Sequence, residues 1–273
     1  MNKPRKKCIF CSNPVDSKEH LWSVWMHRHL GQPIATRHNR HTITKWPDGR
    51  EDTNGPTNRT GGAFTIQVRA VCSSCNSGWM NRAEGRVRPF LRDMIEGNPV
   101  TLGATQIEDL AYWCAIKFIV LEHASDDTSL TPRRDRVAFR ESGKIPSYFR
   151  IYVGNHASKH RSGLRRSSRC MALSHEGPKP PLVGTAKNIQ TTTILMGKLF
   201  IHLNAARVDN FEIERAYIVA RVWDECRVWP IVPATRKWPH RPLLDDAGLS
   251  MIAHTLETLF SASNTIWLDE TPI

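Results

Sequence analysis

The sequence predicts an α+β protein in two parts, and three features indicate this. Two C-x-x-C pairs, Cys8–Cys11 and Cys72–Cys75, enclose a segment with short strand patterns and precede a helix pattern. The step Gly97-Asn98-Pro99 ends that helix pattern. Several alternating apolar runs follow, flanked by helix patterns, as in a mostly antiparallel sheet covered by helices. We therefore expect one unit over residues 1–97 and an α+β domain over residues 98–273.

The two cysteine pairs predict a structural zinc site. Seven cysteines placed at random in this chain would give on the order of 0.2 C-x-x-C pairs, and the sequence holds two. Four thiolates on two short turns suit a tetrahedral zinc ion, so Cys8, Cys11, Cys72 and Cys75 are its expected ligands. The alternative is a set of buried, reduced cysteines.

The first unit is expected to contain two strands between the cysteine pairs and one helix after them. Residues 31–62 are rich in Gly, Pro, Asn and Thr, which predicts a mobile loop or an insertion over a functional site. The other expected elements, in chain order, are a short helix over 21–30 with Leu21, Val24 and Trp25 inward, strands over 42–46 and 64–68, and an amphipathic helix from Trp79 to Ile95.

The second unit begins with a helix whose apolar residues cover most of its circumference. Thr105 to Glu108 forms the pattern of a capping box in front of it. Basic loops are expected at 132–136 and 159–166. The remaining expected elements are strands over 148–154, 169–173, 191–203, 216–223 and 227–232, a hairpin turn at 224–226, and a last helix that Asp245 or Asp246 caps.

The charge favours a polyanionic partner. The net charge is +12, and residues 1–100 hold sixteen Lys or Arg against eight Asp or Glu. Such a concentration of positive charge is typical of a surface that binds nucleic acid. Lys6 and Lys7 lie in a basic N-terminal arm that could follow phosphates. The arginines of the helix after Cys75 either bind phosphates or form a solvated face; they are Arg82, Arg86 and Arg92.

The residues around the cysteine pairs resemble a known family. Glu19-His20 precedes Leu21-Trp22, and Cys75 is followed by Asn76 and by Gly78-Trp79-Met80. Over residues 8 to 84 the chain resembles zinc-bearing members of the HNH endonuclease superfamily, and more narrowly HNH-containing bacterial and phage proteins that share these elements. The resemblance implies a ββα-metal unit in which a β-hairpin and a helix hold one divalent cation.

The resemblance also implies roles for individual residues. His20 would be the general base that activates water, and Glu19 would be a ligand of the divalent cation. Asn76 would supply an oxygen ligand where the family usually has a terminal His, as in the HNN variants. Such oxygen ligands suit Mg²⁺ or Mn²⁺. The sequence departs from the pattern, because Glu19 stands for the commoner Asp and Asn76 is also a good helix N-cap residue.

The middle Asn of the family pattern is not fixed by the sequence. Asn39, Asn54 and Asn58 all lie between the expected strands, and we favour Asn58. The leading hypothesis is a metal-dependent endonuclease that hydrolyses phosphodiester bonds in DNA. RNA is a second substrate, and a catalytically inactive zinc module that binds nucleic acid or protein is the alternative.

The setting expected from the sequence is a reducing cytoplasm. Cys114, Cys170 and Cys226 have no C-x-x-C partner, and no stretch reaches the ~18 apolar residues of a membrane helix or the apolar run of a signal peptide. We expect no membrane partner, while the second unit could form a homodimer. Proteins with these elements commonly act in phage biology or in bacterial defence.

Overall fold

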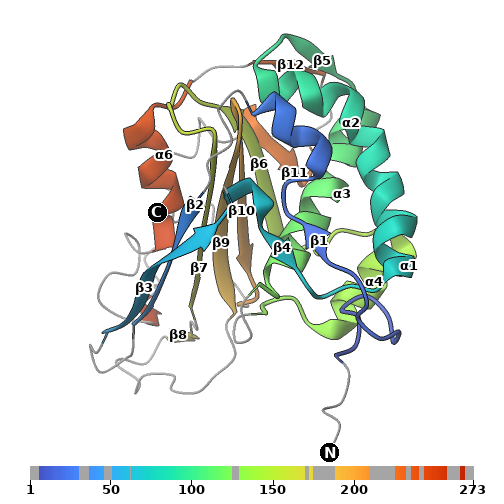
Figure 1. The fold of residues 1–273 in the computed structure, drawn as a ribbon, viewed down its shortest axis with the longest axis vertical. Coiled ribbons are helices and arrows are strands. Elements are labelled where there is room, and N and C mark those ends of the chain that lie inside the picture. Colours follow the sequence, from blue (N-terminus) through green and yellow to red (C-terminus); the bar gives the residue numbers. More distant parts are fainter. Residues whose placement is uncertain are drawn as a thin grey trace, which may run out of the picture.

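The structure is a computed structural model of the 273-residue chain, shown in Figure 1. It describes residues 6–30, 37–45, 51–61, 63–124, 129–169, 172–174, 188–208, 225–231, 235–239, 243–256 and 265–267. The strand expected over 216–223, Cys170 and Asp224 lie outside the described residues. The described part is α+β with antiparallel sheets, as the sequence predicts.

A small antiparallel ladder precedes the helix, but its first strand is Glu19–His20 and not the expected strand over 42–46. Strand β1 (Glu19–His20) pairs antiparallel with β4 (Gln67–Val68), so that His20 lies opposite Gln67. The chain then enters α1 (Ser73–Cys75), the π-helical turn η3 (Asn76–Met80) and α2 (Asn81–Glu96). Each C-x-x-C pair therefore lies next to this small β-ladder, the second at the start of the helical stretch.

The short helix after β1 is a 3₁₀ helix, η1 (Val24–His29). Leu21 is buried, as expected, and Trp25 is partly buried, but Val24 is 63% exposed, so the prediction that it faces inward is wrong; Met26 is buried in its place. Because a 3₁₀ helix has three residues per turn rather than 3.6, the inward positions differ from those of an α-helix.

Residues 31–62 contain a long hairpin. Strand β2 (Arg37–Lys45) pairs antiparallel with β3 (Glu51–Thr60). The predicted strand over 42–46 is thus the end of a longer strand. In β3, Gly55 has a φ of 110°, a backbone conformation that favours glycine. Threonine is frequent in both strands, and its β-branched side chain favours extended backbone even where Asn, Gly and Pro suggest a loop. The expected strand over 64–68 is partly the 3₁₀ turn η2 (Ala63–Thr65) and partly β4.

Helix α2 ends as the sequence predicts. Its last turn is closed by Gly97, which has a φ of +86° and whose N–H donates to the carbonyl of Met94 (3.2 Å). The apolar stripe of α2 is buried and consists of Ala83, Val87, Phe90, Leu91, Met94 and Ile95. The short strand β5 (Val100–Leu102) then leads to α3 and pairs with β12 (Arg236–Trp238).

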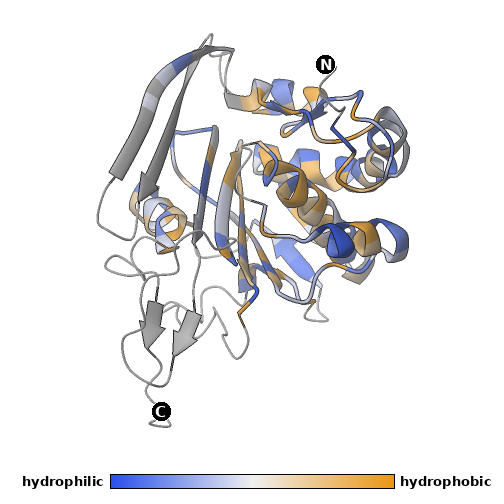
Figure 2. Ribbon diagram, turned by 90° about the horizontal axis from the view of Figure 1, so that it is seen from below, coloured by the Kyte–Doolittle hydropathy of each residue, from blue (hydrophilic) through white to orange (hydrophobic). Residues whose placement is uncertain are grey.

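Helix α3 (Ala104–Leu121) is the central helix of the structure. Its N-cap residue is Gly103, whose N–H donates to Gln106 Oε1 (2.8 Å), so the capping pair begins two residues before the predicted one. Most of its residues from Leu110 to Leu121 are buried because α2 packs on one side and the large sheet on the other. Figure 2 shows this helix as largely hydrophobic.

The large sheet has five antiparallel strands in the order β11-β6-β10-β9-β7. Gly197 (φ +63°) makes the turn that divides the expected stretch 191–203 into two strands; its Cα lies so close to Ile95 that an added Cβ would meet the carbonyl oxygen at 2.3 Å. The strands are β6 (Phe149–Asn155), β7 (Ser162–Arg169), β9 (Ile189–Met196), β10 (Leu199–Ala206) and β11 (Arg227–Trp229).

Two predicted basic loops are regular structure. Residues 133–136 begin helix α4 (Arg133–Ser142), and residues 162–166 lie in β7. The charged side chains suggested solvent-exposed loops, but Arg136 is only 9% exposed and Arg166 donates to the carbonyl of Leu121 (3.2 Å). Arginine can bury its stem while its guanidinium group satisfies backbone carbonyls.

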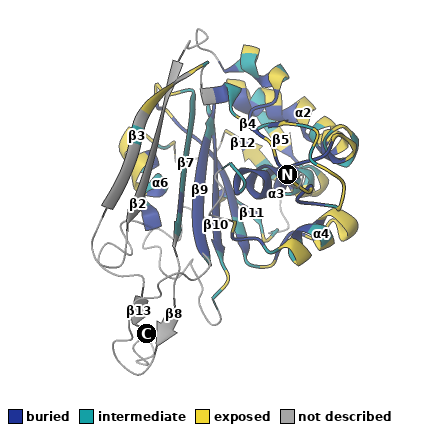
Figure 3. Ribbon diagram, turned by 60° about the horizontal axis from the view of Figure 1, so that its bottom comes forward, coloured by how far each residue is buried: buried dark blue, intermediate teal, exposed yellow. Residues whose placement is uncertain are grey.

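Helices cover both faces of the large sheet (Figures 1 and 3). Helix α3 contacts β6 and β11, while α6 (Asp246–Ala253) contacts β9 on the other face. Asp245 caps α6, as predicted, by accepting from the N–H of Gly248 (2.8 Å). Strands β8 (Ala172–Ser174) and β13 (Thr265–Trp267) form a small parallel pair. The hairpin turn expected at 224–226 is not found where the chain is described, because Glu225 and Cys226 are helical.

One hydrophobic core runs through both predicted units. It contains Phe10 and Leu91 from the first, and Trp113 and Phe149 from the second. The indole N–H of Trp22 also donates to the carbonyl of Leu195 in β9 (2.9 Å). The domain boundary at residue 97 stays a prediction. The apolar side chains on its two sides pack into the same hydrophobic core. Among the described helices, none has the length and apolar character needed to cross a membrane.

Candidate metal centre and active site

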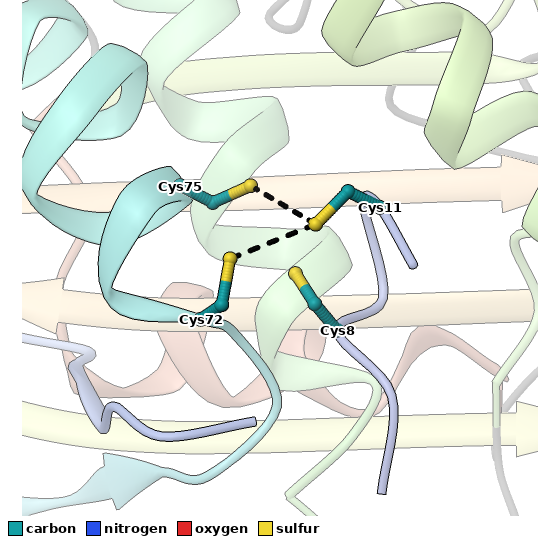
Figure 4. A group of neighbouring side chains, drawn as sticks. All are labelled: Cys8, Cys11, Cys72 and Cys75. Carbon is teal, nitrogen blue, oxygen red and sulfur yellow. Dashed lines mark hydrogen bonds between the residues drawn. The ribbon is translucent and has the colours of Figure 1, made fainter. Parts of the chain in front are cut away.

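The structure brings the four predicted zinc ligands together. Cys8 and Cys11 lie on the N-terminal turn, Cys72 is the N-cap residue of α1, and Cys75 is its last residue. Their sulfur atoms are all within 4.8 Å of one another (Figure 4). Cys11 Sγ is 3.6 Å from Cys72 Sγ and 3.8 Å from Cys75 Sγ. Zn–S bonds of about 2.3 Å in a tetrahedron place sulfurs about 3.8 Å apart. This cysteine cluster (Cys8, Cys11, Cys72 and Cys75) therefore fits a metal such as zinc.

The local backbone holds the cluster's two turns in place. The N–H of Cys8 donates to the carbonyl of Asn13 (2.8 Å), and the N–H of Asn76 donates to that of Cys72 (2.9 Å). Asp16, which sequence reasoning missed, accepts from both the N–H and the hydroxyl of Ser73 (2.6 and 2.9 Å). These hydrogen bonds hold the pKa of Asp16 below its ordinary value. Asp16 lies in the irregular segment before β1 and thus stabilises the start of α1.

Helix α4 supports the cluster from outside. Arg133 donates through Nη1 to the carbonyl of Cys8 (3.2 Å) and through Nη2 to that of Cys11 (3.0 Å). Arg136 donates to the carbonyl of Ile9 between them (3.2 Å). Because carbonyls of a tight turn have few partners within the turn itself, these arginines satisfy groups that would otherwise be left unpaired.

A cavity of about 270 Å³ lies beside the β1–β4 ladder. We call it the site cavity; its polar lining combines the predicted Glu19, His20 and Asn76 with side chains that sequence reasoning did not select. The full lining is Glu19, His20, Ser23, Val24, Trp25, Asn76, Met80, Asn81, Glu84, Trp113, Ile116 and Lys117. The three residues that the family resemblance singles out therefore face one shared space.

His20 is half-buried at the edge of the site cavity. Its Nε2 lies 2.7 Å from the side-chain amide nitrogen of Gln67, which is its partner across the ladder. Burial lowers the pKa of His20 below its ordinary value of 6.5. A neutral imidazole is the form that can accept a proton, so this surrounding suits a general base near neutral pH.

Asn76 is one of the residues that line the site cavity. Its Nδ2 donates to Ser17 Oγ (2.8 Å) and to the carbonyl of Lys18 (3.2 Å), and Asn76 Oδ1 accepts no hydrogen bond from the described residues. The backbone of Asn76 is helical (φ −63°, ψ −57°), and the N-cap position of α1 is Cys72. The alternative that Asn76 serves as a helix N-cap is therefore wrong.

Glu19 takes part in a buried ion pair that the sequence did not predict. Its Oε1 lies 2.5 Å from Nζ of Lys117 in α3, and Glu84 Oε2 in α2 lies 3.3 Å from the same nitrogen. Glu84 also accepts from Trp25 Nε1 (2.9 Å) and from Ser23 Oγ. Burial lowers the pKa of Lys117, but the two carboxylates outweigh it and raise that pKa above its ordinary value of 10.5. Lys117 therefore stays charged between them.

The site cavity offers oxygen donors of the type that Mg²⁺ or Mn²⁺ prefers. In the described part of the chain, Glu19 Oε2 and Asn76 Oδ1 accept no hydrogen bond, while Glu19 Oε1 and Glu84 are taken up by Lys117 and its neighbours. Both oxygens belong to residues that line the site cavity. They do not form a closed cage of carboxylates.

The other predicted site residues lie elsewhere. Asn58 is in β3, opposite Asn39 of β2, and Asn54 lies opposite Thr42; the side chain of Asn58 is exposed and does not line the site cavity. Lys6 and Lys7 are exposed at the start of the described chain.

The three arginines of α2 differ in their partners. Arg86 pairs with Asp109 (2.6 Å) and lies over the ring of Tyr112, and Arg92 pairs with its neighbour Asp93 (3.3 Å). Arg82 is exposed and has no ion pair among the described residues. Of the three, Arg82 is the one that no carboxylate pairs with in the described part of the chain.

Comparison of the chain with protein-family models, with curated proteins and with solved structures finds no match. The four-cysteine cluster and the site cavity are therefore interpreted from their own geometry.

Proposed function

We propose that this protein is a metal-dependent HNH-type endonuclease that hydrolyses phosphodiester bonds in DNA. The observation that supports this best is that Glu19, His20 and Asn76 line one cavity, directly beside a four-cysteine cluster that fits zinc. The order of β1, β4 and helix agrees with the ββα-metal unit that the resemblance implies. The net charge of +12 favours a polyanionic substrate.

In this proposal, His20 takes a proton from the attacking water. Burial keeps its imidazole neutral, and its Nε2 contacts the side-chain amide of Gln67. Nδ1 takes the proton when the amide oxygen of Gln67 faces the ring and accepts the Nε2 proton. Glu19 and Asn76 would hold a divalent cation through their side-chain oxygens. Bound Mg²⁺ or Mn²⁺ would stabilise negative charge on the phosphate and on the departing 3′ oxygen. The cysteine cluster would hold zinc, which would fix the position of the N-terminal turn relative to α1.

The test is cleavage of a supercoiled plasmid with Mg²⁺ or Mn²⁺. The native protein is expected to nick the plasmid, whereas His20→Ala is expected to bind it equally in a gel-shift assay and to leave it intact, because the proton acceptor is gone. His29→Ala is the matched control, since His29 is on the neighbouring 3₁₀ helix, pairs with Glu96 and does not line the site cavity. Equal cleavage by native protein and His20→Ala would remove the basis of the proposal.

The second candidate is a catalytically inactive zinc module that binds nucleic acid or protein. The ion pair between Glu19 and Lys117 favours it, because an ammonium group already compensates the carboxylate that would hold the cation. In that case native protein shifts the plasmid in a gel and cuts neither it nor a single-stranded RNA of the same sequence. RNA cleavage without DNA cleavage would instead identify RNA as the substrate.

The proposed setting is the cytoplasm of a bacterial or phage-infected cell, where thiols stay reduced and available for zinc. A role in phage biology or in bacterial defence, and a homodimer through the second segment, belong to the same proposal.

A further inference from the structure

The strongest unassigned feature of the site cavity is the ammonium group of Lys117. Its side chain is 3% exposed, and its Nζ lies 2.5 Å from Glu19 Oε1 and 3.3 Å from Glu84 Oε2. The same nitrogen donates to the carbonyl of His20 (3.0 Å) and to Ser23 Oγ (3.3 Å). Helix α3 thus places one fixed positive charge at the meeting point of β1 and α2.

The charges in the cavity lining are unevenly committed. Glu84 is held by three donors, namely Lys117, Trp25 and Ser23, so its carboxylate is already satisfied. For Glu19, the hydrogen bond from Lys117 occupies Oε1. With His20 neutral, two carboxylates and one ammonium group leave one net negative charge around the cavity. A divalent cation that binds there must share Glu19 with the ammonium group.

We propose that Lys117 competes with the divalent cation for Glu19 and thereby keeps the cation affinity of the nucleic-acid-free site low. This inference rests on the proposed function only in taking Glu19 as a cation ligand. Two positive groups that share one carboxylate repel each other, and the repulsion is strong where solvent is excluded. Removing the ammonium group should therefore increase the affinity for Mn²⁺ by about tenfold or more.

A purely structural role of Lys117 makes a different prediction. If Lys117 only holds α3 against β1 and α2, its replacement lowers stability and leaves the affinity for Mn²⁺ unchanged. The two roles are separated by a pair of double variants that keep the same net charge in the cavity. Lys117→Met with Glu84→Gln leaves Glu19 free of its competitor, whereas Lys117→Met with Glu19→Gln leaves only Glu84, which Trp25 and Ser23 still hold.

The experiment is a Mn²⁺ titration of the zinc-loaded, full-length protein without nucleic acid, read from the electron paramagnetic resonance signal of free Mn²⁺. We expect Lys117→Met/Glu84→Gln to bind Mn²⁺ about tenfold or more tightly than native protein, and Lys117→Met/Glu19→Gln to show no gain. Single Lys117→Met should bind at least as tightly as the first double variant. Unchanged zinc content and circular dichroism show that each variant is folded.

Two results would overturn the inference. In the first, Lys117→Met/Glu84→Gln binds Mn²⁺ no more tightly than native protein; in the second, both double variants gain equally, so that Glu19 is not the ligand in question. Because no nucleic acid is present, the result is independent of cleavage. Equal plasmid cleavage by native protein and His20→Ala would defeat the proposed function and leave this inference standing. A Mn²⁺ titration that fails in either of these two ways would defeat this inference and leave the role of His20 in cleavage untouched.

Discussion

His20 Nε2 lies 2.7 Å from the side-chain amide nitrogen of Gln67, directly across the β1–β4 ladder. An amide nitrogen can only donate, so in this orientation Nε2 accepts the hydrogen bond and the ring proton lies on Nδ1. For Nδ1 to accept a proton, the ring proton must lie on Nε2, which requires the amide oxygen of Gln67 to face the ring. Gln67 therefore decides which nitrogen of His20 is basic.

Changing Gln67 should alter the pH dependence of cleavage. A general base works when deprotonated, so the rate rises with pH up to a plateau above its pKa. Since burial holds the pKa of His20 below 6.5, native protein should be on the plateau at neutral pH. Gln67→Glu places a negative charge beside the ring and should move the acid limb to higher pH, as measured by single-turnover plasmid nicking.

The neutral variant Gln67→Leu is the control for this shift. It removes the hydrogen bond without adding charge, so it should lower the plateau rate by about tenfold and leave the acid limb near its native position. An acid limb of Gln67→Glu that coincides with the native one would show that the two side chains do not interact in solution.

The cysteine cluster should be required for folding. Changing Cys72 and Cys75 together to Ser removes two of four thiolates, and structural zinc contributes on the order of 10 kcal/mol to the fold it stabilises. We expect loss of bound zinc and of the cooperative thermal transition. Cys114→Ala is the matched control, because Cys114 is equally buried but lies in α3 outside the cluster, and it should retain about one zinc per chain. Full zinc content in the double Ser variant would contradict the assignment.

Arg133 should stabilise the first cysteine pair. Its guanidinium group donates to the carbonyls of Cys8 and Cys11, so Arg133→Ala should lower the free energy of unfolding by about 1 kcal/mol and speed zinc loss to a chelator. Arg134→Ala on the same helix is the control, since its side chain is 82% exposed and pairs with its neighbour Asp135. If both variants release zinc at the native rate, the two hydrogen bonds contribute nothing to the cluster.

Glu84 should make the fold sensitive to acid. Burial alone would raise the pKa of Glu84. The Lys117 ammonium group and the hydrogen bonds from Ser23 and Trp25 outweigh burial, so the pKa lies below its ordinary value of 4.5. A carboxyl whose pKa is lower in the folded state stabilises the fold above its unfolded-state pKa, and this stabilisation is lost as pH falls through the folded-state pKa.

Glu84→Gln should therefore lower the free energy of unfolding at pH 7 by about 1–3 kcal/mol, and the difference from native protein should shrink below about pH 4.5. Urea unfolding at a series of pH values measures this. A constant difference between pH 7 and pH 3 would mean that the charge of Glu84 is not involved. Glu96→Gln is the control, because Glu96 lies on the same helix and pairs at the surface with His29.

Local patterns predicted the metal centre and the ends of α2 and α6. Each C-x-x-C pair, Gly97 and Asp245 is a signal within a few residues of its own position, so the chain alone reveals it. The two cysteine pairs meet across 61 positions, and their shared need for four ligands predicts that they meet. Lys117 and Glu84 could not be predicted in this way, because Lys117 meets Glu19 from 98 positions away. The available signal was a single lysine in the largely apolar stretch of α3 from Leu110 to Leu121, which indicates a buried partner of opposite charge but does not identify it.

Charge misled the interpretation of α4 and β7. Arg133 and Arg136 were expected in a solvated loop, yet both donate to carbonyls of the first cysteine turn, and Arg166 donates to the end of α3. Whether an arginine meets solvent or a backbone carbonyl depends on tertiary packing, which short-range patterns do not contain. The hairpin of β2 and β3 was missed for a related reason, since its turn-forming residues hid the contribution of its threonines.

The arginines of α2 should contribute unequally to DNA binding. Arg82 has no ion pair among the described residues, whereas Arg86 is paired with Asp109 at 2.6 Å. A phosphate can therefore bind Arg82 without displacing a carboxylate, but it must compete for Arg86. We expect Arg82→Gln to weaken binding to a duplex about three- to tenfold and to reduce the slope of log K against log salt by about one. Arg86→Gln should change both quantities less, as measured by fluorescence anisotropy between 50 and 200 mM salt. If the two variants bind alike, the ion pair with Asp109 does not persist at the DNA surface, and if neither differs from native protein, this face of α2 does not contact DNA.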